Sequence, residues 1–154
     1  MASYYLLIVK DHRCDGRLIK AIEIFEDRVK NRFWGLGRRS AHLKKIRCGD
    51  KVVFYVGGRY GGLLVGSGTV GSEPHPISEE ERKRGLCLHS EVYTHLMTFS
   101  EIEVWPKPVL LKDICGQLSF ITDKSKPRIY LQGAVKRLGE DDYRTICGAA
   151  KYTA

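Results

Sequence analysis

The chain has 154 residues, 43% of them hydrophobic and 29% charged, a composition that fits a globular domain and excludes a disordered or fibrous chain. No apolar run approaches the roughly 20 residues that a helix needs to cross a bilayer. The first residues, MASYYLLIVKDH, lack the basic leader and cleavage site of a signal peptide. We therefore expect a single domain over residues 1–154 with no membrane partner, in the cytoplasm or, in a eukaryote, the nucleus.

The net charge is +8, and the excess is concentrated between residues 28 and 47. That segment contains no acidic residue, and Phe33 and Trp34 interrupt its basic side chains. A cluster of this kind is either a solvated face that aids solubility or the binding surface for a polyanion. We favour a nucleic-acid partner because of the aromatic residues.

The five cysteines are widely spaced, and no CxxC or HxxxH pair offers the spacing of zinc ligands. We expect no disulfide framework, no metal site and no cofactor. The cysteines are interpreted as small core residues, since no local signature supports a Cys–His nucleophile.

The first half of the chain predicts strands at 3–9 and 51–56 and an amphipathic helix over 17–29, with Ile22 and Phe25 on its apolar face and Asp27 and Arg28 on its polar face. Between them, residues 31–40 (NRFWGLGRRS) indicate a loop. Ser40 is a candidate cap for a short helix over 41–47, followed by a turn at Gly49-Asp50.

Residues 66–71 (GSGTVG) match the GxGxxG pattern of dinucleotide-binding loops. Such a loop must lead into a helix, which Pro74 and Pro76 disfavour. We interpret 63–70 instead as the second arm of a hairpin, joined to strand 51–56 through residues 57–62. Its glycines then mark a bend or a close approach of another backbone.

The second half predicts a short helix at 78–84, capped by Ser78 and Glu81, and a strand over 91–105 that Pro106 and Pro108 interrupt. A short element at 109–114, a last strand at 128–135 and a closing helix at 140–150 follow. This order does not fit a parallel βαβ array. It favours an α+β fold, a small, mostly antiparallel barrel with helices packed outside and a mouth that can form a pocket.

Four segments, in order along the chain, resemble the EVE domains of the PUA-like superfamily, relatives of the YTH readers of methylated adenine. They are YYLLIV, FWGL followed by IRCGDKVVFYV, VGSGTVGSEPHP, and YLQGAVKRLGEDDYRTI. The sequence departs from the family at Ala41, where an Asn is frequent, and at His75, where a Tyr is frequent.

The resemblance implies a PUA-like pseudo-barrel that holds a flipped, modified base among aromatic side chains. It assigns Trp34 and Tyr5 to the cage, Val9, Lys10 and Asp11 to the strand end that contacts the base, and Gln132 and Gly133 to the closing strand. For Trp34 a core role and a ligand role remain equally open. For Tyr5 and Tyr55 a core role is slightly favoured over the pocket.

Reading one base edge needs polar groups, and those available are Asp11, Ser40, His42 and Gln132. Basic side chains suited to phosphate contacts are Arg38, Arg39, Lys44, Lys45, Arg128 and Arg137.

The sequence therefore predicts a non-enzymatic reader of a modified base, methylated adenine or modified cytosine, with DNA favoured over RNA as partner. One alternative is an RNA-binding accessory domain without modified-base specificity. A second is a small hydrolase acting on a nucleobase-like substrate through Asp11 with Lys10, or through His42. A third is a domain fused to or associated with a restriction or regulatory protein.

Overall fold

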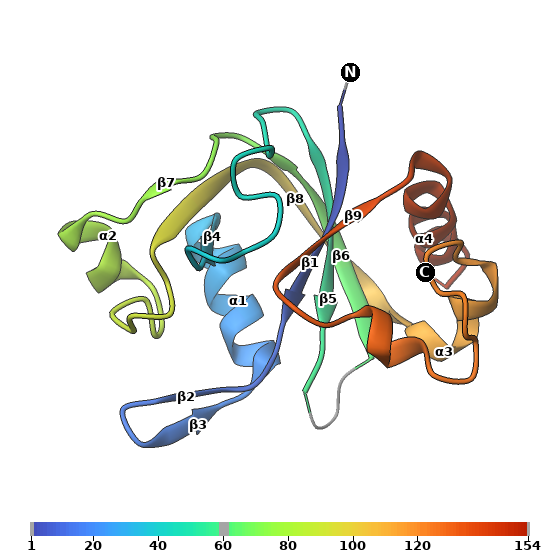
Figure 1. Cartoon of the computed structure of the whole chain (residues 1–154), viewed down its shortest axis with the longest axis horizontal. Coiled ribbons are helices and arrows are strands. Elements are labelled where there is room, and N and C mark those ends of the chain that lie inside the picture. Colours follow the sequence, from blue (N-terminus) through green and yellow to red (C-terminus); the bar gives the residue numbers. More distant parts are fainter. Residues whose placement is uncertain (1, 59–61, 154) are drawn as a thin grey trace.

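A computed structural model describes residues 2–58 and 62–153 of the chain (Figure 1). Over these residues the strands are β1 (Tyr4–Val9), β2 (His12–Cys14), β3 (Arg17–Ile19), β4 (Phe33–Leu36), β5 (Lys51–Val56), β6 (Leu63–Val70), β7 (His75–Pro76), β8 (His95–Leu110) and β9 (Val135–Leu138). The α-helices are α1 (Ala21–Asn31), α2 (Glu79–Arg84), α3 (Leu111–Ile114) and α4 (Glu140–Thr153), and the 3-10 turns are Cys115–Gln117 and Pro127–Tyr130. None of the helices in these ranges combines the length and the apolar composition that crossing a bilayer requires.

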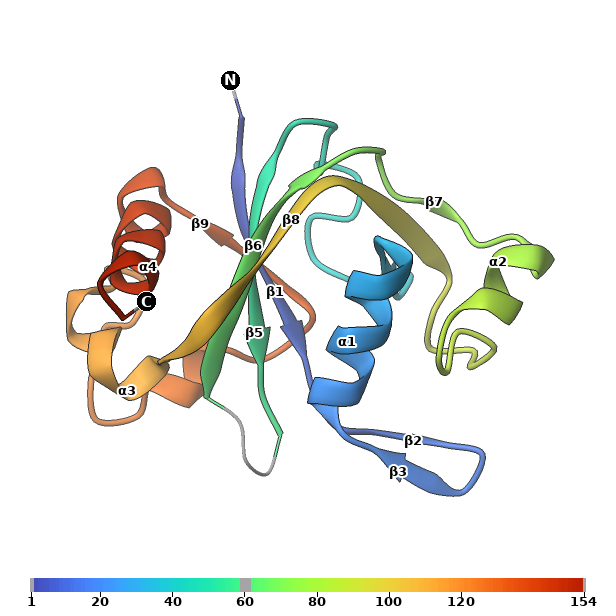
Figure 2. The ribbon, with the colours of Figure 1, turned by 180° about the vertical axis from the view of Figure 1, so that it is seen from behind.

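The main sheet has the order β4-β8-β6-β5-β1-β9, with β7 also paired to β8. Its pairs are antiparallel except for β1 and β5, which run parallel. The long strand β8 curls the sheet into a half-barrel, with α1 on one side and α3 and α4 on the other (Figures 1 and 2). The predicted α+β fold, a mostly antiparallel pseudo-barrel with helices around it, is confirmed.

The central strands are buried on both faces, which explains their continuous apolar runs. Along β1, Tyr5 and Leu7 enter a core with α1, whereas Leu6 and Ile8 enter a second core with α3 and α4. Strand β5 alternates in the same way. The sheet therefore separates two cores, and the site described below lies mainly on the α1 side.

The glycines of GSGTVG lie in β6, the second arm of the predicted hairpin, where the β8 backbone approaches closely. A Cβ atom on Gly66 would lie 2.5 Å from the carbonyl oxygen of Glu103, and one on Gly68 2.9 Å from that of Glu101. The rejection of a dinucleotide loop is thus confirmed. Part of the predicted hairpin loop, residues 59–61, lies outside the described residues.

The predicted helix over 17–29 begins too early. Residues 17–19 form β3, which pairs with β2 through a two-residue turn at Asp15 (φ 55°) and Gly16 (φ 76°). Asp-Gly in this conformation is a typical hairpin turn. Helix α1 starts only at Ala21. The residue before it, Lys20, donates its N–H to the Glu23 carboxylate at 2.9 Å and so caps the start of the helix.

The expectation that Pro106 and Pro108 interrupt the long strand is wrong, because β8 continues to Leu110. Leu64 pairs with Val109 and Gly66 with Val104, so a step of two residues in β6 faces a step of five residues in β8. The prolines therefore sit in a bulge, where no ladder hydrogen bond is demanded of them.

Three further segments differ from the prediction. FWGL is strand β4 rather than a loop, because both of its faces are buried, and residues 41–45 are turns rather than a helix. The last strand is β9, some residues later than the predicted 128–135, which instead contains a 3-10 turn. For FWGL and β9, pairing with β8 and with β1 overrides the local pattern.

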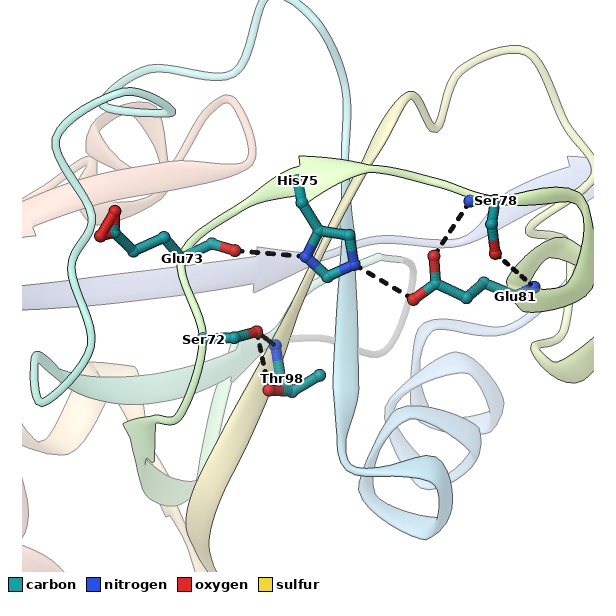
Figure 3. A network of polar contacts seen from close by, with 6 residues as sticks. All are labelled: Ser72, Glu73, His75, Ser78, Glu81 and Thr98. Atoms are coloured by element: carbon teal, nitrogen blue, oxygen red, sulfur yellow. Dashed lines mark hydrogen bonds and ion pairs between the residues drawn. The ribbon is translucent and has the colours of Figure 1, made fainter.

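The predicted cap of α2 is confirmed (Figure 3). The Ser78 N–H donates to the Glu81 carboxylate at 2.9 Å, and the Glu81 N–H donates to the Ser78 hydroxyl at 3.1 Å. The second carboxylate oxygen of Glu81 lies 3.1 Å from Nε2 of His75. This network joins α2 to β7 and so to the rim of the sheet.

Candidate functional site

A pocket of about 900 Å³ opens on the α1 side of the half-barrel. The end of β1, the start of β2, helix α1, strand β4, the turn at 37–40 and residues 91–94 and 133–134 all contribute to its wall. The structure thus brings segments from both ends of the chain around one hollow, large enough for a nucleobase.

Many of the residues that the sequence analysis selected line this pocket. They are Val9, Lys10, Asp11, Trp34, Arg38, Arg39, Ser40 and Gly133. The Asp11 carboxylate accepts a hydrogen bond from the Ala21 N–H at 2.8 Å, which fixes it at the start of α1. This bond anchors the short connection between β1 and β2 to the helix.

The other selected residues lie outside the lining, namely Tyr5, His42, Tyr55, Gln132, Lys44, Lys45, Arg128 and Arg137. Tyr5 is buried in the α1-side core and Tyr55 in the other core, while Gln132 is exposed. The His42 ring packs 5.7 Å from that of Tyr5, and its pKa is lowered by burial and by nearby Lys45 and Arg137.

Trp34 belongs to both the core and the pocket. It is 4% exposed, and its ring lies 5.1 Å from that of Phe54 and 6.4 Å from that of Phe99. The part of Trp34 that is not packed against these rings borders the pocket. The sequence placed this residue in a polar loop, whereas strand β4 and the aromatic cluster hold it rigidly.

Tyr93 forms a second aromatic wall that the sequence analysis missed. A Cβ on Gly35 would lie 2.8 Å from its ring, so the glycine after Trp34 is what allows Tyr93 to pack against β4. The His12 ring meets Tyr93 edge-on at 5.9 Å. Burial raises the pKa of Tyr93, with Arg28 opposing the effect, so its hydroxyl remains a neutral donor at neutral pH.

Arg28 lies on the buried face of α1, not on the polar face where the sequence analysis put it. It is 2% exposed, and its Nη1 donates to Asp27 at 2.6 Å and to the Leu86 carbonyl at 2.9 Å. Its spacing after Ala21, Ile24 and Phe25 follows the helical period, which is the signal that could have revealed it.

Two buried polar atoms at this pocket have no hydrogen-bond partner within the described ranges: Nη2 of Arg28 and Nε2 of His12. Both residues line the pocket wall. A buried donor without a partner costs stability, roughly 1–3 kcal/mol, so such groups often serve a ligand. The pocket therefore offers a fixed cationic donor beside its aromatic walls.

A basic turn borders the same opening. The Ser40 N–H donates to the Gly37 carbonyl at 3.0 Å, and the Gly37 N–H donates to the Ser40 hydroxyl at 3.0 Å. These bonds place Arg38 and Arg39 at the two central positions of the turn. Arg38 also borders a neighbouring hollow with Lys44 and Arg47, so the positive charge continues away from the pocket.

Solved structures of similar fold cover almost the whole chain. Human THYN1 in complex with 5-methylcytosine-containing DNA matches with a TM-score of 0.67, 12% identity, 97% of this chain and 98% of that chain. The YTH domain of Zygosaccharomyces rouxii MRB1 with N6-methyladenosine RNA matches with a TM-score of 0.61 and 11% identity, over 98% of this chain and 88% of that chain. The N-terminal domain of Thermococcus gammatolerans McrB with m5C DNA matches with a TM-score of 0.56 and 17% identity, over 98% of each chain. The fold is thus that of the PUA-like EVE and YTH domains.

No family model matches the sequence. A UPF0310 protein of Pyrococcus abyssi is 32% identical over 152 residues, which span 94% of this chain and 96% of that protein. The chain belongs to the UPF0310 family.

Proposed function

We propose that this protein is an EVE-type reader of nucleic acid, a single domain over residues 1–154, which holds a flipped, modified base in the pocket between Trp34 and Tyr93. The observation that carries the proposal is the unpartnered guanidinium nitrogen of Arg28 on the wall of this aromatic pocket. Similar folds in complex with methylated DNA or RNA support the same function.

The energetics require both the aromatic walls and the polar groups. Flipping a base costs a few kcal/mol of unstacking, and stacking on an aromatic ring returns about 1–3 kcal/mol. A buried methyl group adds about 0.8 kcal/mol, which is only about a four-fold preference. Discrimination among bases therefore depends on polar groups, chiefly Arg28 and Asp11.

Arg28 and Asp11 have complementary chemistry. An arginine only donates, so Arg28 suits a carbonyl oxygen or an unprotonated ring nitrogen, whereas the Asp11 carboxylate accepts from an exocyclic amino group. Cytosine and adenine each carry an amino group next to a ring acceptor. The proposed ligand is thus a modified cytosine or a methylated adenine, with Arg38 and Arg39 on the flanking phosphates. We propose DNA over RNA because two of the three similar folds were solved with methylated DNA.

Fluorescence-polarisation binding tests the proposal with matched DNA and RNA duplexes, unmodified or carrying one methyladenine, methylcytosine or hydroxymethylcytosine. We expect one modified probe to bind more tightly than its unmodified partner. Tyr93→Ala should weaken that probe at least about 5-fold because the stacking surface is removed. Tyr130→Ala, at a half-buried tyrosine outside the pocket lining, is the matched control and should bind normally.

Equal affinity for modified and unmodified probes would instead indicate an accessory nucleic-acid-binding domain. Absence of binding to every probe would overturn the proposal and leave the pocket for a small-molecule ligand. A hydrolase would be recognised by altered probe masses after incubation, a readout that the same samples provide.

A further inference from the structure

A second polar cluster lies at the tip of the β2–β3 hairpin, where the turn meets the segment that follows α2. Nε2 of His89 lies 3.6 Å from Sγ of Cys14 and 3.0 Å from a carboxylate oxygen of Asp15. The Cys14 sulfur lies 4.0 Å from the same carboxylate. These donor atoms form a group of three potential metal ligands within 4.8 Å of one another, among the residues that the structure describes.

The arrangement differs from a catalytic triad. In a Cys–His–Asp triad the nucleophile and the carboxylate contact opposite nitrogens of the imidazole. Here the sulfur and the carboxylate both approach Nε2 of His89. Three donor atoms that converge on one point, rather than lying in a row, are typical of ligands around a shared cation.

The spacing of the three atoms fits tetrahedral zinc. With Zn–S near 2.3 Å and Zn–N or Zn–O near 2.0–2.1 Å, tetrahedral angles place the sulfur about 3.6 Å from each lighter ligand and those two about 3.3 Å apart. The corresponding distances here are 3.6 Å for sulfur to nitrogen, 4.0 Å for sulfur to oxygen and 3.0 Å for nitrogen to oxygen. Small side-chain adjustments would bring all three onto one ion.

Cys87 is a candidate for a fourth ligand, although its sulfur is not among the three donor atoms that lie within 4.8 Å of one another. It is 2% exposed and adopts a left-handed backbone conformation (φ 63°) two residues before His89. Its thiol neighbours that of Cys14. With Cys87 the site would have four ligands, two sulfurs, an imidazole and a carboxylate, which is the usual number for zinc.

We propose that Cys14, Asp15, Cys87 and His89 form a zinc site that joins the β2–β3 hairpin to the segment after α2. Bound as two thiolates, one carboxylate and a neutral imidazole, the ion and its ligands would carry a net charge of −1. The same segment carries Leu86, whose carbonyl accepts from Arg28. The metal would thus tie together two segments that flank the pocket, independently of what the pocket binds.

Cobalt(II) substitution in the reduced full-length protein tests this proposal. Tetrahedral cobalt bound by thiolates gives intense visible absorption and a sulfur-to-metal charge-transfer band. We expect one equivalent of Co²⁺ to bind and Zn²⁺ to displace it. Cys14→Ser and His89→Ala should each weaken Co²⁺ binding at least about 10-fold, since the loss of an outer-shell partner alone costs that much.

Cys48→Ser is the matched control, because Cys48 is exposed and its sulfur contacts the Gly71 carbonyl instead. It should leave the cobalt spectrum unchanged. His89 is also exposed, so His89→Ala should fold normally by circular dichroism even if Cys87→Ser does not. Unchanged Co²⁺ binding in His89→Ala and Cys14→Ser, or no thiolate–cobalt absorption in the parent protein, would overturn the zinc site. A Cys14–Cys87 disulfide that persists under reductant in peptide mapping would overturn it as well.

Discussion

At the scale of single residues, Trp34 shows how one side chain serves both the core and the pocket. It packs on Phe54 and Phe99 and also borders the hollow. A truncation at this position therefore changes stability and binding together. Tyr93, which is half-buried, is the better position for separating the two effects.

The first prediction concerns Trp34→Ala. Removing this buried ring should lower the free energy of unfolding by about 3–5 kcal/mol, because the cavity left in the aromatic cluster cannot close. Urea denaturation measures the change, with Tyr93→Ala as the comparison that should lose clearly less. A loss for Trp34→Ala no larger than that for Tyr93→Ala would contradict the placement of Trp34 in the core.

Asp50 carries the second prediction. It is buried, and its two carboxylate oxygens accept from the Ser3 N–H at 2.9 Å and the Arg47 N–H at 2.8 Å. Asp50→Ala leaves both donors without a partner and should cost roughly 1–3 kcal/mol of unfolding free energy. Asp50→Asn keeps one acceptor, so its urea midpoint should fall between those of the parent and Asp50→Ala. Equal stability of all three proteins would refute the role of this turn.

At the scale of elements, α2 depends on a local network rather than on burial. It has no buried residue, so its capping box and the His75–Glu81 contact hold its start (Figure 3). Burial opposes ionisation of Glu81, but hydrogen bonds from Ser78 and His75 outweigh it and lower the pKa of this carboxyl. The ionised form is therefore the one that stabilises the fold.

The third prediction follows from the sign of this shift. Because the pKa of Glu81 is lower in the folded state, its stabilising effect is complete above the ordinary value of 4.5 and is lost as pH falls through the folded-state value. Glu81→Gln should thus destabilise the protein at neutral pH, by about 1 kcal/mol on the scale of a missing cap. The difference from the parent should shrink below pH 4.5 in thermal melts. A difference that stays constant over this range would be inconsistent with an ionised cap.

The fourth prediction contrasts two glycines. Gly66→Ala would push a Cβ against the β8 backbone, which cannot move aside, and should cost about 1–3 kcal/mol. Gly148→Ala lies in helix α4 with open space around the new Cβ, and should stabilise the protein by about 0.5–1 kcal/mol. Thermal denaturation of both variants measures the two stability changes, which should have opposite signs. A Gly66→Ala variant as stable as the parent would show that β6 and β8 are less tightly apposed.

At the scale of the whole molecule, part of the positive charge lies at the edge of the pocket. Arg38 and Arg39 project from the turn at its edge, and Lys44 and Arg47 continue the basic surface. Such charges would increase affinity for any nucleic acid without distinguishing its bases. Base discrimination and general affinity should therefore be separable by mutation.

The fifth prediction tests that separation. Replacing Arg38 and Arg39 by alanine should weaken binding to modified and unmodified DNA alike. It should also flatten the slope of log affinity against log salt by about 0.9 for each phosphate that the protein no longer neutralises. The control replaces Lys107 and Lys112, which are exposed and do not line the pocket, and should leave the slope unchanged. Equal salt-dependence slopes for the parent, the Arg38/Arg39 variant and the control would show that the turn does not contact nucleic acid.

Much of the fold could be predicted from local patterns. The apolar runs of β1 and β5, the β5–β6 hairpin and the cap of α2 follow from composition and spacing within a few residues. The errors fell where a distant partner decides the structure: FWGL becomes a strand only because β8 pairs with it. Likewise, the prolines of β8 are tolerated only because a bulge receives them.

The order of the predicted elements determined the barrel class, and local charge determined the basic character of residues 28–47. The resemblance to EVE domains supplied part of the pocket lining. Only the tertiary structure decided that Arg28, His12 and Tyr93 share one wall, and that Cys14 and Asp15 meet His89. A burial pattern records that a side chain is covered but not which residue covers it. The partner depends on how far the sheet curls and on the register of its strands, and that is set by the packing of the whole domain.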